Sequence, residues 1–161
     1  VEVALRRYPP DPTEDTGSLA GDLLVIQREQ VEMYTDPLAA SLLTLILGAC
    51  ADEPTTAEAF SEQFLKPRRA ATVRVLQRAV QRGEIPPVED MEYALDHISG
   101  SFLLRAAMPG TQPINEAFAR RTVLSLLRDL QAPEPRHSLH SALQPPTSKK
   151  GNNHDRFRRL R

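Results

Sequence analysis

Polar side chains among apolar neighbours are the residues of this sequence that could bind and orient a small molecule. His97 and Arg105 fall in an otherwise apolar stretch with a helical repeat. A few polar groups converging on an apolar cavity usually fix the orientation of a ligand. Each also has a plainer explanation: His97 could be a hydrogen-bonded interface residue, and Arg105 could extend its charge outward to solvent.

Aromatic side chains form a second group of candidates. Phe60 and Phe64 are one helical turn apart, so they share a helix face. They could line a pocket or belong to an ordinary core. Tyr34 ends a helical stretch, and its hydroxyl could point into a pocket or into solvent. The small residues at 99–101 (Ser-Gly-Ser) would let another helix approach closely, or would enlarge a pocket.

Two further patterns could bind charged ligands. Arg74, Arg78 and Arg82 recur at four-residue spacing, which suits a phosphate site but suits a solvated helix face better. His137 and His140 have metal-like spacing, yet no third ligand is near them in a stretch that reads as disordered. We therefore predict no metal site.

The sequence lacks the signatures of common enzymes. No nucleophile elbow, glycine-rich phosphate loop, HExxH motif or pair of catalytic carboxylates occurs in it. The single cysteine, Cys50, excludes an internal disulfide and fits a core residue in a reducing compartment better than a thiol sensor. We predict that the protein is not an enzyme and needs no cofactor.

Composition favours an all-α fold. A chain of 161 residues that is 40% hydrophobic is long enough for one domain with a substantial core. No strand-length stretch alternates β-branched with polar residues. Positive charge concentrates in the last thirty or so residues, so the helical part is acidic and a poor match for nucleic acid. With no signal peptide and no apolar run long enough to cross a bilayer, a cytoplasmic protein without membrane contact is predicted.

Periodicity and capping signals place the elements. We predict helices over residues 18–35, 36–51, 55–82, 89–107 and 115–130, in a bundle of about five to six main helices. Ser18 and Asp36 are the predicted N-caps of the first two. The third should begin at a capping box formed by Thr55 and Glu58 and end at Gly83, with a kink or break at Pro67.

Two helices have unusually wide apolar surfaces. The helix over 36–51 is apolar on every side, which predicts a central helix around which the others pack. The helix over 115–130 should contact its own core on one side and a partner on the other. Beyond Pro133 the composition turns polar and basic, so we divide the chain into a helical domain, 1–131, and a disordered tail, 132–161.

Three stretches together resemble a known family. They are Asp15-Thr16-Gly17-Ser18-Leu19-Ala20-Gly21-Asp22-Leu23, Asp36-Pro37-Leu38, and the run Phe60-Ser61-Glu62-Gln63-Phe64-Leu65-Lys66-Pro67-Arg68-Arg69 followed by Val75-Leu76-Gln77-Arg78-Ala79-Val80-Gln81-Arg82-Gly83-Glu84-Ile85. In this order and spacing they resemble the C-terminal domain of TetR-type transcriptional repressors, over about residues 1–130.

The resemblance implies a helical domain that binds a small apolar or aromatic effector and pairs with a second copy of itself. The effector would lie among the first four helices. Its candidate contacts are Tyr34, Leu43, Leu47, Phe60, Phe64, His97, Phe102 and Arg105. The last two helices would form the homodimer interface. Its candidate residues are Ser99, Gly100, Leu103, Phe118, Arg121, Leu124, Leu127 and Arg128.

The sequence departs from the family at its beginning. Residues 1–7 read as the remnant of the helix that joins two domains, and no stretch of this sequence resembles a helix-turn-helix. DNA would therefore be contacted only through the absent N-terminal domain. Two alternatives stay open: a truncated module that forms heterodimers with intact regulators, or an unrelated helical carrier of small molecules.

Overall fold

The computed structural model describes residue 8 and residues 15–108, 110 and 112–131. Over this part of the chain the fold is all-helical, as predicted. The elements are α2 (Leu19–Thr35), α3 (Pro37–Asp52), α4 (Pro54–Phe60), a π-helical turn η1 (Ser61–Leu65), α5 (Lys66–Gln81), α6 (Met91–Ala107) and α7 (Glu116–Gln131). The expectations for residues 1–7, for the tail 132–161 and for its two histidines lie outside the described residues.

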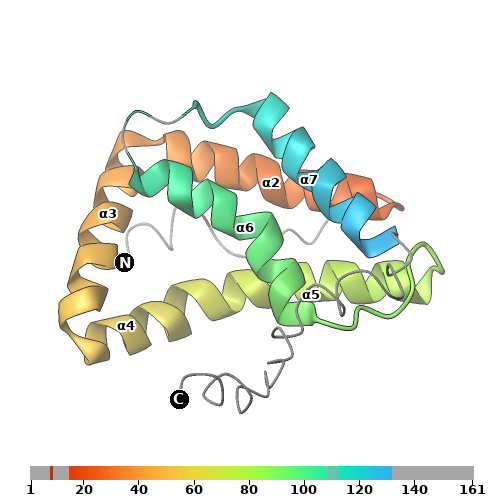
Figure 1. Cartoon of the computed structure of the whole chain (residues 1–161), viewed down its shortest axis with the longest axis horizontal. Coiled ribbons are helices and arrows are strands. Elements are labelled where there is room, and N and C mark those ends of the chain that lie inside the picture. Colours follow the sequence, from red (N-terminus) through yellow and green to blue (C-terminus); the bar gives the residue numbers. More distant parts are fainter. Residues whose placement is uncertain (1–7, 9–14, 109, 111, 132–161) are drawn as a thin grey trace, which may run out of the picture.

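The predicted caps of the first two helices are confirmed. The Ser18 hydroxyl accepts a hydrogen bond from the Gly21 amide, 3.1 Å away. Asp36 ends α2 and starts α3, since its carboxylate accepts the amides of Leu38 and Ala39 with Pro37 in the first turn. One residue therefore sets the corner between these helices (Figure 1).

The capping box predicted at Thr55 is wrong. Helix α4 begins at Pro54, and its N-cap is Glu53, whose side chain makes no capping bond. A proline fits the first turn because that position needs no amide donor, so the helix starts one residue before the predicted box. The neighbouring Thr56 hydroxyl instead donates to the Glu53 carboxylate at 3.0 Å.

The break predicted at Pro67 takes the form of a π-helical turn. The turn η1 lies between α4 and α5, and the Lys66 amide reaches back to the Ser61 carbonyl. Pro67, which has no amide hydrogen, then falls in the first turn of α5. At its other end α5 stops as predicted: Gly83 has φ of +72°, and the amides of Gly83 and Glu84 bond to the carbonyls of Val80 and Ala79.

Helix α3 lies at the edge of the molecule, so the prediction of a central helix is wrong (Figure 1). It has one buried side chain, Leu43, whereas Leu38 and Leu45 are 55% and 70% exposed. A helix that is apolar on all sides can be buried, but its composition does not determine which helices pack beside it. The central position belongs to α2, which packs against α3, α5, α6 and α7.

The core has three parts. The main cluster joins α2, α5, α6 and α7 through Leu19, Leu23, Leu76, Ile98 and Leu126, all at most 1% exposed. A second cluster at the far end of α2 contains Met33, Leu43, Phe60 and Phe64. A third packs Phe102 against Phe118 and Ala119. The second cluster brings α2, α3, α4 and η1 together, and the candidate site lies beside it.

None of the described helices is, by itself, long and apolar enough to cross a membrane. Helices α2 and α3 reach the required length and hydropathy only as a pair, and they are bent by 86° at the break between them.

Candidate ligand-binding pocket

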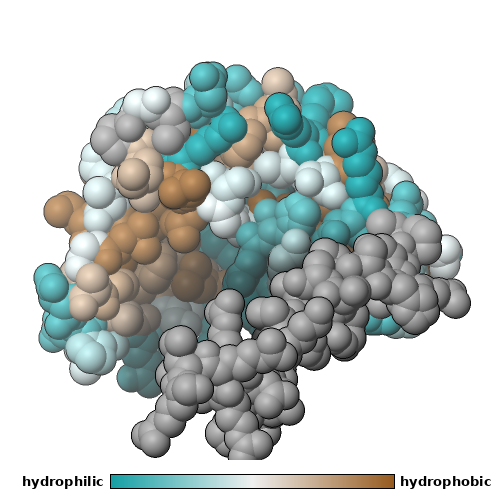
Figure 2. Space-filling view, in the orientation of Figure 1, coloured by the Kyte–Doolittle hydropathy of each residue, from teal (hydrophilic) through white to brown (hydrophobic). Residues whose placement is uncertain are grey.

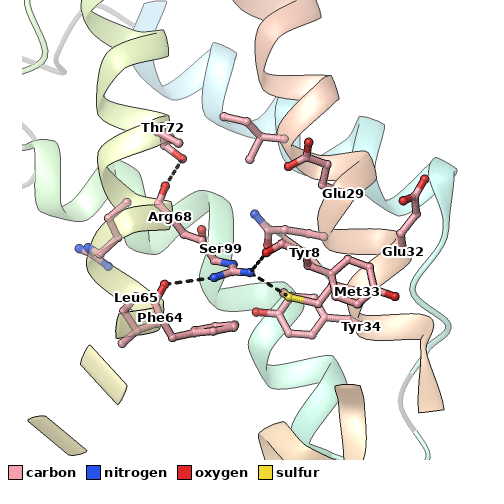
Figure 3. Close-up of a pocket in the computed structure, with 14 residues that line it drawn as sticks. Tyr8, Glu29, Glu32, Met33, Tyr34, Phe64, Leu65, Arg68, Thr72 and Ser99 are labelled. Carbon is pink, nitrogen blue, oxygen red and sulfur yellow. Dashed lines mark hydrogen bonds between the residues drawn. The ribbon is translucent and has the colours of Figure 1, made fainter. Parts of the chain in front are cut away.

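An open cavity of about 200 Å³ lies between the C-terminal half of α2 and the N-terminal half of α5 (Figure 3). Its floor is apolar and its rim carries several polar groups. The lining residues are Tyr8, Ile26, Glu29, Gln30, Glu32, Met33, Tyr34, Phe64, Leu65, Arg68, Arg69, Ala71, Thr72 and Ser99. Such a mixture of apolar walls and few polar groups is typical of small-molecule sites.

Arg68 is the most distinctive group in the cavity. Its guanidinium carbon lies 3.9 Å from the centre of the Phe64 ring, a cation–π geometry. The guanidinium donates hydrogen bonds to the carbonyl oxygens of Tyr8 at 2.6 Å and Phe64 at 3.4 Å, and lies 3.6 Å from the Met33 sulfur (Figure 3). Burial lowers the pKa of Arg68, against the opposing effects of Tyr34 and Glu29. The charge is held in place mainly by neutral groups.

Two further polar groups face the cavity. Burial raises the pKa of Tyr34 to about 12, although the charge of Arg68 opposes this, so its phenol stays protonated at neutral pH. The side-chain oxygen of Gln30 is buried and has no hydrogen-bond partner. An unpaired buried acceptor costs free energy that a donor on a ligand would recover.

Four of the eight predicted contact residues line a cavity. Tyr34 and Phe64 line the main one, which continues into a narrow pouch also lined by Leu43 and Phe60. The rings of Phe60 and Phe64 stack with centres 4.9 Å apart. Leu47 is half-buried against the second cluster but does not line either space. These positions show what the residues face, while a ligand contact by any of them stays a prediction.

The other three predicted contacts point elsewhere. Phe102 is completely buried, its ring centre 4.7 Å from that of Phe118. His97 faces α7, where its Nε2 lies 3.1 Å from the Ser125 hydroxyl. The Arg105 guanidinium covers the Phe118 ring at 3.6 Å and donates to the Pro113 carbonyl.

Two polar groups of the cavity, Arg68 and Gln30, were missed in the sequence, whereas Tyr34 was a candidate. Arg68 and Gln30 come from α5 and α2, not from α6, whose polar residues drew attention because their neighbours are apolar. The π-helical turn sets the direction of Arg68, and a helical wheel assumes a regular helix at that point. Its position one helical turn after Phe64, itself a candidate contact, was the available signal.

A buried ionic cluster ties the start of α2 to the end of α5. The Asp22 carboxylate, which has no exposed side-chain surface, accepts the amide and hydroxyl of Thr16 at 2.7 Å each. Arg78 and Arg82 pair with its other oxygen at 3.2 and 3.1 Å. The Glu84 carboxylate accepts the Leu19 amide at 2.7 Å. The basic stripe is thus neither a phosphate site nor simply a solvated face, because two of its arginines pair with a buried carboxylate.

The same cluster explains the stretches that carried the family resemblance. Burial by itself raises the pKa of Asp22, but the Thr16 hydrogen bonds and the two arginines outweigh it and leave that pKa below its ordinary value. We call Thr16, Asp22, Arg78, Arg82 and Glu84 the α2–α5 clamp. Its residues occur in the first stretch and in the second half of the third, so these parts of the resemblance correspond to a structural joint, whereas Phe60–Arg69 includes residues of the cavity.

Comparison with known proteins decides the family. Residues 13–126 match the model of the tetracyclin repressor-like C-terminal domain. The chain belongs to the TetR family. The match is to the C-terminal part of such regulators.

Two TetR-related proteins illustrate the match. An uncharacterised HTH-type transcriptional regulator of Bacillus subtilis, YdeS, is 26% identical over 121 residues, which is 75% of this chain. The chain spans about 60% of the length of that relative. The crystal structure of the TetR family transcription regulator SCO0332 superposes with a TM-score of 0.68 at 28% identity, covering 80% of this chain and 69% of the other.

The predicted dimer residues of this TetR-type domain occupy different environments. Gly100, Arg121, Leu124 and Arg128 are exposed, and Leu124 is 52% so. Leu103 and Leu127 are half-buried against the protomer's own core clusters. The structure places Ser99 at the cavity and Phe118 in the third core cluster, so neither presents its side chain outward. The apolar stripe on α7 is wide, so the sequence does not show which of its residues are buried within the protomer itself.

Proposed function

We propose that this chain is the small-molecule-sensing and dimerisation domain of a TetR-type transcriptional repressor. The cavity between α2 and α5 is the observation that carries the proposal. It combines apolar walls with a protonated phenol, an unpaired amide oxygen and a half-buried guanidinium. A cytoplasmic location and the division of the chain at residue 131 stay predictions that accompany this proposal.

The position of the clamp suggests how occupancy of the cavity could be transmitted. The clamp fixes the N-terminal end of α2 to the C-terminal end of α5, whereas the cavity separates their opposite ends. A ligand that prefers a wider separation would rotate the two helices about the clamp. In an intact regulator this shifts the population towards a geometry whose DNA-binding heads no longer match both half-sites.

A dye-binding experiment with a matched pair of variants tests the sensing function. N-phenyl-1-naphthylamine is neutral and apolar and fluoresces on entering an apolar site. Ala71 lines the cavity and Ala70, its neighbour on α5, is exposed. We expect the wild type and Ala70→Leu to bind the dye, and Ala71→Leu to lose binding because its side chain fills the cavity. Equal binding by both variants, with melting temperatures unchanged, would contradict the proposal.

Dimerisation is supported by the outer faces of α6 and α7. Gly100 and Leu104 on α6 and its C-cap residue Met108 recur at four-residue spacing, and both larger side chains are more than half exposed. Figure 2 shows apolar side chains gathered over α3 and the adjoining end of α6. Exposed apolar side chains in a helical row suit a self-complementary helix–helix contact with a second copy.

A further inference from the structure

We infer that the cavity takes a monoanionic small molecule, whose carboxylate pairs with Arg68 while its apolar body lies on Phe64 and Met33. The inference rests on the proposed sensing function and adds the chemical class of the effector. Its basis is the contrast between the surroundings of Arg68 and those of the other arginines.

Arg68 is a half-buried cation that has no carboxylate within 4.0 Å among the described residues. Its contacts are two carbonyl oxygens, a thioether sulfur and an aromatic face. Several more exposed arginines of the described chain have carboxylates within 4.0 Å. Such pairs are Arg28 with Glu116, Arg69 with Glu92 and Asp96, Arg82 with Asp15, Asp22 and Glu84, and Arg120 with Glu116.

Burying a cation away from water is costly unless an anion compensates it. Arg69, at the same cavity, has such anions at contact distance. Arg68 has none within 4.0 Å among the described residues, and Glu29 acts on its charge without a contact ion pair. A carboxylate in the cavity would provide the missing counter-ion. The guanidinium still has donors beyond those directed at Tyr8 and Phe64, and a planar guanidinium can pair with a carboxylate through two parallel hydrogen bonds.

The other charges of the cavity limit the ligand to one negative charge. Glu29 and Glu32 line its α2 side and would repel a dianion. Arg69 also lines the cavity, but its charge is already balanced by Glu92 and Asp96. Arg68 can therefore pair with one ligand carboxylate, whereas a second negative charge would meet only the two glutamates.

The dimensions fit an apolar body of one ring with a short chain. A dry cavity of about 150 Å³ holds a benzene molecule. This cavity, of about 200 Å³, is larger and opens into the pouch beside Phe60 and Leu43. The Phe64 ring and the Met33 sulfur provide the faces on which an aromatic ring would pack.

A series of three probes of equal size tests the charge preference. 4-Phenylbutyrate, 4-phenylbutanamide and 4-phenylbutylamine carry a negative, neutral and positive end on the same apolar body. Each is titrated against N-phenyl-1-naphthylamine bound to the whole chain, and the displacement gives an apparent Kd. We expect the acid to bind about tenfold or more tightly than the amide, as a charge-assisted hydrogen bond predicts, and the amine to bind most weakly.

Variants then assign the preference to Arg68. Arg68→Met should reduce the ratio of amide Kd to acid Kd to about one, because it keeps the length of the side chain but removes the charge. Lys66→Met is the matched control: it removes an exposed cation two residues before Arg68 in the sequence and should leave the ratio unchanged. If Arg68→Met does not fold, Arg68→Lys takes its place and should retain part of the preference for the acid over the amide. The three Kd values of the wild type then still decide whether the cavity prefers an anion.

The outcomes separate this inference from the proposed function. Dye binding with equal Kd values for acid and amide, tighter binding of the amine, or an unchanged ratio in Arg68→Met would overturn the inference and leave the sensing function standing. Absence of dye binding by the wild type would overturn both.

Discussion

Asp22 shows at the scale of one residue what maintains the geometry around the cavity. A carboxylate with no exposed side-chain surface is stable there because Thr16, Arg78 and Arg82 satisfy it. The hydrogen bonds and charges that hold it also join α2 to α5. The residue is therefore structural, although a buried acid between two arginines could suggest a catalytic or phosphate-binding group.

Asp22→Asn should destabilise the fold by about 3 kcal/mol, because it leaves two arginines facing a neutral amide. The measurement is urea unfolding at neutral pH. Asp52→Asn, a change at an exposed residue at the end of α3, serves as the control and should cost less than about 0.5 kcal/mol. A loss below about 1 kcal/mol for Asp22→Asn would mean that the clamp contributes little.

The clamp also predicts an acid-sensitive stability. The pKa of Asp22 is lower in the folded chain than in the unfolded chain, so the unfolded state takes up its proton first as the pH falls. The stabilisation is fully present above about pH 5 and is lost as the pH falls below about 4. Unfolding free energies measured from pH 7 to pH 3 should fall less steeply for Asp22→Asn than for the wild type. Parallel curves would contradict the assignment.

At this scale the sequence predicted residue types better than residue roles. Tyr34 and Phe64 do line the cavity, because aromatic residues near helix ends often face such spaces. His97 and Arg105 do not, because their apolar neighbours belong to the contact of α6 with α7. Which polar group reaches a cavity depends on the packing of helices distant in the sequence, and a single helix does not contain that information.

At the scale of elements, Gly21 permits the close approach of Thr16 to α2. A Cβ atom at Gly21 would lie 2.2 Å from the Thr16 hydroxyl oxygen and 2.9 Å from its Cβ, whereas a Cβ at Gly48 in α3 would meet nothing within 4 Å. Alanine is a better helix former than glycine by about 1 kcal/mol, so the environment decides the outcome at each position.

Gly21→Ala should destabilise the chain because it displaces Thr16 from Asp22. Gly48→Ala should stabilise it by about 0.5–1 kcal/mol, since only the helix propensity changes. Both values come from thermal or urea unfolding of the same preparation. A stabilisation by Gly21→Ala equal to that of Gly48→Ala would show that Thr16 can move away without loss.

The element ends were predictable because their causes are local. Ser18, Asp36 and Gly83 act on amides and carbonyls within a few residues, and the structure has them in these roles. The position of α3 was not predictable, since an all-round apolar helix can pack in the centre or at an edge. The π-helical turn was foreseen as a break at Pro67 but not in its form.

At the scale of the whole molecule, two exposed leucines allow a test of whether the dimer interface lies on α6 and α7 or on α3. Leu104 on α6 is 61% exposed and Leu45 on α3 is 70% exposed. Since both point outward, a glutamate at either position should leave the protomer folded. Only the first lies on the helix pair through which a second copy is proposed to bind.

We expect Leu104→Glu to convert a dimer into a monomer at micromolar concentration, because a charge would be buried at the contact. Leu45→Glu should remain dimeric. Light scattering coupled to size-exclusion chromatography gives the mass of each. A wild-type monomer would refute dimerisation, and a dimer lost only in Leu45→Glu would move the interface to α3.

The central claim is that a small molecule binds between α2 and α5, and amide hydrogen exchange tests it most directly. The chain is compared with and without saturating N-phenyl-1-naphthylamine. We predict slower exchange in the segments that line the cavity, residues 26–34 and 64–72, with the distant part of α7 unchanged. Protection confined to α6 and α7, or no protection in those two segments while the dye is bound, would contradict it.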